Sequence, residues 1–157
     1  AASDVYKRQV LIQGRDAFQI PEHEKRSLYG YVEQTFHRVP GTVKDQITLY
    51  DDSFTMEEVR EAARIAGLDA TIEQLEKGYD TLCTSEIFSQ GQWQLLSIAR
   101  AAVAKPKLLL LDEITANLDA QTEEEVLQAL KRASEGRTVI SISHRMNAET
   151  GRVIPIG

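Results

Sequence analysis

The sequence predicts an α/β fold built on a parallel β-sheet, with a mainly helical segment between its two α/β parts. The first observation is the stretch KLLLLDE at residues 107–113, which has no polar alternation, as is typical of a strand buried on both faces of a parallel sheet. The second is the order strand, helix, strand over residues 107–144, which indicates a βαβ unit with a right-handed crossover. The third is helical periodicity from Thr55 onward.

Two short strands are expected before the helical segment. The first is QVLIQG, residues 9–14, an apolar stretch closed by Gly14. The second is LYGYVEQ, residues 28–34, which is rich in aromatic and β-branched residues. A loop with a turn at Pro40-Gly41 follows, because proline and glycine together favour a change of chain direction.

The helical segment contains two helices with clear start and stop signals. Thr55 and Glu58 form a capping box, and Gly67 ends the first helix. Ser89 begins the second helix, and Pro106 ends it. The two apolar faces have helical spacing and consist of Val59, Ala62, Ala63 and Ala66 in the first helix and of Leu95, Leu96, Ala99 and Ala102 in the second.

A third helix follows the KLLLLDE strand and leads into a last strand. We expect Thr122 and Glu125 to form its capping box and Gly136 to end it. Its apolar stripe consists of Val126, Leu127, Leu130 and Ala133. The last strand is RTVISISH, residues 137–144, which is rich in β-branched residues.

Length and composition exclude several classes of protein. The chain has 157 residues, of which 42% are hydrophobic, which is enough for one domain with a core. The net charge is −6 and there is no long basic run, which disfavours a protein that binds duplex nucleic acid. Cys83 is the single cysteine, so an internal disulfide is excluded. No stretch has the length and apolarity of a membrane span or a secretory signal.

Asp112 and Glu113 are the first candidates for a functional site. They end a buried strand at the edge where open parallel sheets bind ligands. An aspartate there is suited to hold hydrated Mg²⁺. The next residue along a strand points the opposite way, so Glu113 would be able to orient and deprotonate a water. The alternative is that both acids serve only as a helix cap or as loop acids.

Three further polar residues follow the expected strands. His144 ends the last strand at the same edge, where it would be able to donate to a phosphate, with a surface histidine as the alternative. Gln34 closes an earlier strand and would be able to bind a metal or a water, with a polar strand terminus as the alternative. His23 and His37 lack such a setting, and we expect them to face solvent.

The segment FSQGQ, residues 88–92, allows two interpretations of equal local merit. Ser89 and Gln92 form a capping box, which is a complete structural explanation. The same helix start offers free N–H groups and a favourable dipole to an anion, and Gly91 allows a phosphate to approach the backbone. Only the order of all the motifs separates the two interpretations.

In that order, the motifs resemble the nucleotide-binding domain of ATP-binding cassette (ABC) transporters. Gln34 in YVEQ is similar to the Q-loop glutamine, and FSQGQ to the signature motif usually written LSGGQ. LLLLDE is similar to the Walker B motif with its catalytic glutamate, TANLD to the D-loop and SISHR to the switch-histidine loop. The stretch VPGTVKDQITLYD is similar to the exporter subgroup.

The resemblance implies a fold, a reaction and partners. The fold would be a P-loop NTPase (RecA-like) core in residues 10–37 and 105–157, with a helical and signature region in residues 38–104. The function would be ATP hydrolysis, coupled to transport across a membrane at a head-to-tail dimer of two such domains. The implied cofactors are ATP and Mg²⁺. The implied partners are a second nucleotide-binding domain and a transmembrane domain, but no nucleic acid, at the cytoplasmic face of the cell membrane.

The resemblance also implies a role for each matched residue. Asp112 would hold Mg²⁺, Glu113 would polarise the attacking water, and Gln34 would contact the metal and the γ-phosphate. His144 would contact the γ-phosphate. The residues that would act on nucleotide from the signature and the D-loop are Ser89, Gly91, Gln92 and Asp119.

The sequence also departs from the family pattern. No G-x-x-x-x-G-K-[ST] loop is present, so we expect an N-terminally truncated domain that is inactive on its own. AASDVYKRQ at the start matches nothing in the family and resembles translated adapter sequence, so the match is expected from about Val10 onward. In the signature, Phe88 replaces a leucine, Gln90 replaces a glycine, and Trp93 stands where a basic residue is usual.

Two alternative functions remain within the family. One is a non-catalytic dimerisation partner with a degenerate signature, against which the retained Glu113 and His144 argue. The other is an ABC-type ATPase of chromosome or repair complexes, which would carry a long coiled coil or a zinc insertion. No heptad run or cysteine cluster is present in this sequence.

Overall fold

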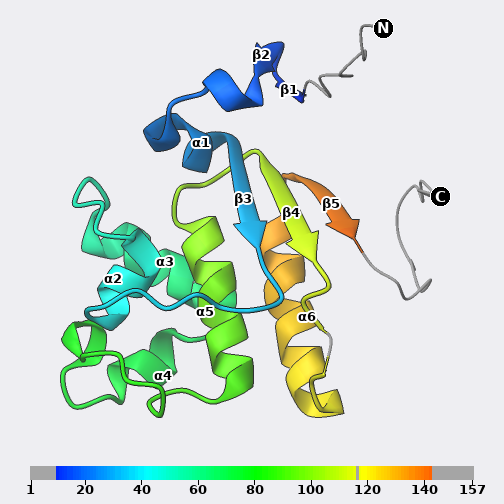
Figure 1. The fold of residues 1–157 in the computed structure, drawn as a ribbon. Helices are drawn as coiled ribbons and strands as arrows, with labels where there is room; N and C mark the ends of the chain where they lie inside the picture. Colours follow the sequence, from blue (N-terminus) through cyan, green and yellow to red (C-terminus); the bar gives the residue numbers. More distant parts are fainter. Residues whose placement is uncertain (1–9, 116, 143–157) are drawn as a thin grey trace, which may run out of the picture.

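The computed structural model describes residues 10–115 and 117–142. Figure 1 shows a small parallel sheet with helices packed against one of its faces and a helical lobe beside it. The first two strands, β1 (Leu11–Ile12) and β2 (Arg15–Asp16), form an antiparallel hairpin separate from that sheet. A 3-10 turn at Ala17–Gln19 and helix α1 (Glu22–Leu28) lead from the hairpin into the sheet.

The parallel sheet has the strand order β3-β4-β5, so β4 is central. Its strands are β3 (Tyr29–Val32), β4 (Leu108–Asp112) and β5 (Thr138–Ile142). Val32 pairs with Leu111, and Asp112 pairs with Ile142, so the carboxyl ends of all three strands meet at one edge. This confirms the parallel sheet that the sequence predicts.

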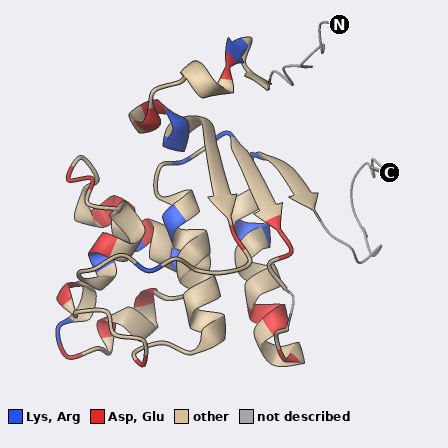
Figure 2. Cartoon of the chain, viewed as in Figure 1, with Lys and Arg blue, Asp and Glu red and all other residues tan. Residues whose placement is uncertain are grey.

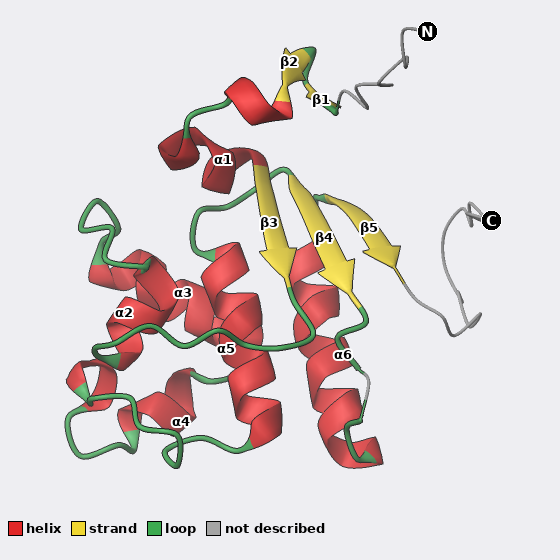
Figure 3. Ribbon diagram, in the orientation of Figure 1, coloured by secondary structure: helices red, strands yellow, loops and turns green. Residues whose placement is uncertain are grey.

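The burial of β4 differs from the sequence prediction. Leu109 and Leu111 are buried, but Leu108 and Leu110 are only half-buried, and every residue of β5 is exposed. The expectation of a strand covered on both faces is therefore wrong for the described residues. In Figure 3, the helices that pack against the sheet lie on one of its sides.

Five further helices complete the described chain. They are α2 (Val43–Thr48), α3 (Met56–Ala66), α4 (Asp69–Glu73), α5 (Gln90–Ala102) and α6 (Ala120–Ser134), with a 3-10 turn at Gly78–Asp80. The capping box at Thr55 and the left-handed Gly67 at the end of α3 are confirmed. Where the sequence predicts a loop with a Pro-Gly turn, α2 begins directly after Thr42, which caps it.

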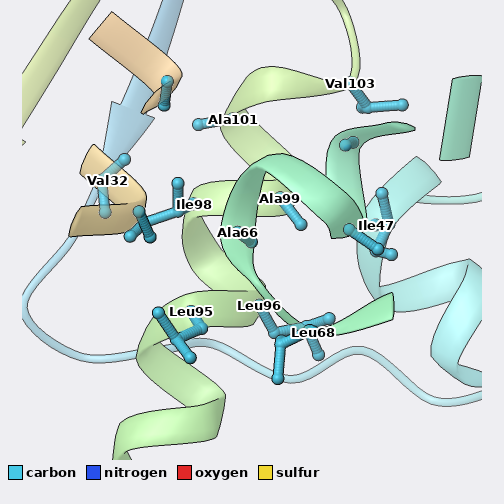
Figure 4. Packing of buried hydrophobic residues seen from close by; sticks show 14 of the residues in the cluster. Val32, Ile47, Ala66, Leu68, Leu95, Leu96, Ile98, Ala99, Ala101 and Val103 are labelled. Atoms are coloured by element: carbon cyan, nitrogen blue, oxygen red, sulfur yellow. The ribbon is translucent and has the colours of Figure 1, made fainter. Parts of the chain in front are cut away.

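Helix α5 is the centre of the packing. It contacts α2, α3, α6 and β3, so most of its residues are buried, the polar Gln94 and Ser97 among them. Figure 4 shows Leu95 and Leu96 of α5 near Ala66 and Leu68, and Ile98 near Val32 of the sheet. One hydrophobic cluster thus joins the sheet and the helical lobe.

Helix α6 begins earlier than the sequence prediction. Asp119 is its N-cap and accepts hydrogen bonds from the N–H groups of Gln121 and Thr122, so the predicted capping box at Thr122 and Glu125 is wrong. Leu127 was expected on the apolar stripe but is 46% exposed. The buried face consists of Val126, Ala129, Leu130 and Ala133.

Candidate functional site

Asp112 ends the central strand, and its carboxylate has a partner on the neighbouring strand. The Tyr31 hydroxyl donates to Asp112 Oδ2 over 3.0 Å. Tyr31 pairs with Leu110, two residues before Asp112, so the contact is a diagonal one on one face of the sheet. This hydrogen bond, with a smaller effect of burial, raises the pKa of Tyr31 above its ordinary value, so the hydroxyl keeps its proton and remains a donor.

Sequence reasoning missed Tyr31. A tyrosine in an aromatic-rich strand carries no local sign that it serves a neighbouring acid. The signal is the pairing of LYGYV with LLLLD, and that pairing becomes visible only when the two strands are in register.

Glu113 lies just beyond the strand in an unusual backbone conformation. Its φ of 43° is in the left-handed region, which costs a residue other than glycine roughly 1–2 kcal/mol. Its N–H donates to the Ile142 carbonyl of β5 over 3.2 Å, which fixes the turn. The prediction that strand alternation directs Glu113 is therefore corrected: the strand ends at Asp112, and this turn sets where the side chain goes.

Gln34 follows β3 at the same edge of the sheet and is exposed. The carbonyl of the preceding Glu33 accepts a hydrogen bond of 2.9 Å from Gln94 Nε2. Because Gln94 is a buried residue of α5, the helix holds the backbone directly before Gln34. Glu33 also pairs with His37, and His23 and His37 are both exposed, as the sequence predicts.

Charges gather at this edge of the sheet. Figure 2 shows acidic residues where β3 and β4 end, while the strands themselves carry none until that point. Among the described residues, no three His, Cys, Asp or Glu side chains come close enough together to hold a metal on their own. His144, expected at this edge, lies outside the described residues.

The first turn of α5 holds the predicted capping box. The Ser89 hydroxyl accepts from Gln92 N over 3.2 Å, and Gln92 Oε1 accepts from Ser89 N over 2.9 Å. Each side chain thus accepts one hydrogen bond from the backbone of the other residue, as the structural interpretation of FSQGQ requires. The N–H groups of Gln90 and Gly91 have no acceptor within the helix, because they precede the first intrahelical bond.

Gly91 has a packing reason to be glycine. A Cβ built on it would lie 2.1 Å from Thr122 Cγ2 of α6, far inside contact distance. The residue is therefore buried at the crossing of α5 and α6. Close helix packing explains this glycine without a phosphate.

Asp119 also serves the fold, at the start of α6. It accepts from the Thr122 hydroxyl over 2.5 Å and from Thr122 N over 3.0 Å. These bonds, that from the Thr122 side chain first, lower the pKa of Asp119 below its ordinary value, so the carboxylate is held in its ionised form. Through Thr122, Asp119 and Gly91 belong to one packed corner of the molecule.

A hollow of about 380 Å³ lies between the segment after β3 and the start of α5. Gln34 lines it from the first segment and Gln90 from the second. Its walls include the rings of Phe36, Phe88 and Trp93. The expected site residues therefore form two groups, one at the sheet edge and one at the first turns of α5 and α6. The hollow lies between Gln34 of the first group and the first turn of α5.

These features define an α/β protein with its polar residues beyond the carboxyl ends of parallel strands, where ligands of such folds bind. The family model described as ABC transporter matches residues 3–116, well over half of the chain. The chain therefore belongs to the ABC transporter family. The match begins at residue 3, which corrects the expectation that residues 3–9 have no counterpart in the family.

Similar proteins include the ABC transporter ATP-binding protein YfiC of Bacillus subtilis, 42% identical over 88% of this chain. ABC transporter B family member 1 of Dictyostelium discoideum is 40% identical over 94% of it. The probable multidrug resistance ABC transporter ATP-binding/permease protein YheH of Bacillus subtilis is 35% identical over 92%. The chain spans 23%, 17% and 22% of the length of these three relatives, respectively.

A solved structure supports the same assignment. The structure of a bacterial Atm1-family ABC exporter with ATP bound has a TM-score of 0.71 and 33% sequence identity, over 89% of this chain and 25% of that chain. This confirms the fold as the α/β type with a parallel sheet that P-loop NTPases of this family share. Within the described residues, no helix has the length and apolarity needed to cross a membrane.

Proposed function

We propose that this chain forms part of the ATP-hydrolysing domain of an exporter-type ABC transporter. The observation that carries the proposal is the pair of acids at the end of β4. Asp112 is held by Tyr31 at 3.0 Å, and Glu113 is turned out of the strand by a left-handed residue conformation. Family membership and the similarity to the solved Atm1-family ABC exporter support the same conclusion.

The acids at the sheet edge fit a magnesium ion that arrives with a nucleotide. Mg²⁺ in nucleotide sites takes one or two protein carboxylates and completes its shell with water and phosphate oxygens. Asp112 would supply one such carboxylate, and Gln34, which follows the neighbouring strand, would supply an amide oxygen. Bound Mg²⁺ would neutralise charge on the phosphates. Tyr31 would keep the Asp112 carboxylate in place for it.

Glu113 is the proposed general base. A general base must lie within hydrogen-bond reach of the water whose proton it takes, and Glu113 directly follows Asp112, the proposed magnesium ligand. The left-handed turn at Glu113 and the bond from its N–H to Ile142 give the side chain a fixed origin at the end of the sheet. His144, after β5, is proposed to donate to the same phosphate.

The first turn of α5 is proposed to act on a nucleotide bound by a second domain. Its free N–H groups, at Gln90 and Gly91, lie at the positive end of a helix dipole and suit a phosphate. The Ser89 hydroxyl accepts from the backbone and retains its own proton to donate, while Gln92 holds that hydroxyl in place. Asp119 is proposed to reach the same interface from the start of α6.

We further propose the partners and place of the parent protein. A second nucleotide-binding domain would complete each ATP site. Closure and reopening of the resulting dimer would drive a transmembrane domain. The helices of residues 38–104 would face that domain at the cytoplasmic face of the cell membrane. No role in nucleic-acid binding is proposed. The chain alone would be inactive, because its sequence contains no phosphate-binding glycine loop with its lysine.

The test is Glu113→Gln in the parent protein. The amide keeps the size and hydrogen-bonding capacity of the side chain but is no base. We expect ATPase turnover to fall by about 10²–10⁴-fold while ATP binding persists. Steady-state hydrolysis and equilibrium binding of labelled ATP measure the two quantities.

Glu135→Gln is the matched control. Glu135 is an exposed acid at the end of α6, at the opposite edge of the sheet, so its amide variant should hydrolyse ATP at the parent's rate. If Glu113→Gln also retains the parent's turnover, Glu113 is not the base.

A further inference from the structure

The segment that carries Gln34, residues 33–38, contacts α5 at several positions along the helix. Gln94 donates to the Glu33 carbonyl over 2.9 Å, close to the start of the helix. Two turns later, Arg100 Nη1 donates to the His37 carbonyl over 2.8 Å. These two hydrogen bonds hold the ends of the segment, and a contact between aromatic rings holds its middle.

Trp93 holds the middle of that segment. Its ring stacks on Phe36 with centroids 5.4 Å apart and planes 26° apart, and Phe36 is two residues from Gln34. The Arg38 guanidinium lies 5.5 Å from the Trp93 ring on the same segment. Trp93 is half-buried and lines the hollow between Gln34 and Gln90.

Trp93 also fixes the first turn of α5. Its ring meets Phe88 edge-on, with centroids 5.1 Å apart and planes at 90°. Phe88 directly precedes the N-cap Ser89, and Trp93 is the fourth residue of the helix. This is the spacing of a hydrophobic staple, which sets the angle at which the chain enters a helix. One ring thus contacts both the Gln34 segment and the residue before Ser89.

We propose that Trp93 is a positioning residue that couples Gln34 to the first turn of α5. A displacement of Gln34 toward its ligand would move Phe36, and the stacked Trp93 ring would carry that movement through Phe88 to Ser89. The inference rests on the proposed function, because it assigns a role to Trp93 within the same ATP site. A ring that only fills space would contribute to stability without this coupling.

The first test compares two substitutions in the parent protein. Trp93→Leu removes the ring but keeps an apolar side chain, whereas Trp93→Phe keeps a ring able to stack on Phe36. We expect Trp93→Leu to lower kcat for ATP hydrolysis by about 3- to 30-fold, with little change in KM for Mg-ATP. The reason is that the groups at the sheet edge remain intact while the first turn of α5 is displaced. Trp93→Phe should restore most of kcat.

Leu75→Ala is the matched control for packing. Leu75 is partly buried against the same core, outside the aromatic stack. Its variant should lower the unfolding temperature and leave kcat unchanged. The proposal is overturned if Trp93→Leu hydrolyses ATP like the parent, or if Leu75→Ala lowers kcat as much at equal loss of unfolding temperature.

A second readout does not depend on hydrolysis and therefore separates this inference from the proposed function. Phe36→Leu should speed hydrogen exchange of the amides at positions 92 and 93, because it removes the stack that holds Trp93. In a Trp93→Leu background the same change should add nothing. Equal effects of Phe36→Leu in both backgrounds would overturn the coupling, whereas a parent without ATPase activity would overturn only the proposed function.

Discussion

The carboxyl edge of the sheet and the first turn of α5 use their polar residues in different ways. At the sheet edge, Asp112 accepts one hydrogen bond from a neighbouring strand, and the backbone of Glu113 is held by β5. At the first turn of α5, the Ser89 and Gln92 side chains bond to each other's backbone, and Gly91 is packed against α6.

The two regions differ in the kind of group that they offer to a ligand. At the sheet edge, the groups offered to a ligand are side-chain carboxylates. Substitutions there should change the chemistry with little effect on the fold. The first turn of α5 offers mainly backbone N–H groups, whose position depends on the cap and on the helix crossing. Substitutions there should change stability and activity together. Three predictions test this contrast.

The largest effect is expected at the sheet edge, from Tyr31→Phe. The variant loses the hydroxyl that donates to Asp112 and keeps the ring. Removing such a supporting hydrogen bond typically weakens metal binding by about 10–100-fold. Titration of Mg²⁺ in the ATPase assay of the parent protein should therefore show a half-maximal concentration higher by about that factor, with an unchanged unfolding temperature.

Tyr50→Phe is the control for this experiment. Tyr50 is also exposed and its hydroxyl also donates a hydrogen bond, but to the Pro40 carbonyl, away from Asp112. Its Mg²⁺ requirement should match that of the parent. A Mg²⁺ requirement of Tyr31→Phe equal to that of Tyr50→Phe would remove Tyr31 from the site.

A smaller effect, mainly on stability, is expected from Gly91→Ala. The new methyl group would overlap Thr122 Cγ2, and overpacking of this kind costs about 1–3 kcal/mol. Thr122→Ser deletes Cγ2 but keeps the hydroxyl that bonds to Asp119. The double variant should therefore regain most of the unfolding temperature that Gly91→Ala loses. If Gly91→Ala costs the same with and without the Thr122→Ser change, the helix crossing is not the reason for the glycine.

The smallest effect is expected from the helix caps, where the chain offers a matched pair. Ser89→Ala and Thr55→Ala each remove a capping box of the same kind, at about 1 kcal/mol. Thermal unfolding should show similar losses. Only Ser89→Ala should also slow ATP hydrolysis, because of these two helices α5 is proposed to face a nucleotide and α3 is not. Equal turnover of the two variants would mean that Ser89 serves the fold alone.

The sequence by itself determined the features that depend on neighbours along the chain. The boxes at Thr55 and Ser89 need only a hydroxyl and a carboxylate or amide three residues apart, so both helix starts were predictable. The start of α6 was not, because Asp119 and Thr122 are both capping residues and their local signals compete. The apolar β4 and the βαβ order predicted the parallel sheet and its acidic edge.

Tertiary structure decided the contacts between elements. The bond from Tyr31 to Asp112 depends on the register of two strands that lie far apart in the chain. The need for glycine at position 91 depends on how closely α5 crosses α6. The stack of Trp93 on Phe36 depends on the path of the chain after β3. Side-chain spacing along one element carries no information about the register, crossing distance or path of another, so these three contacts become visible only in the folded chain.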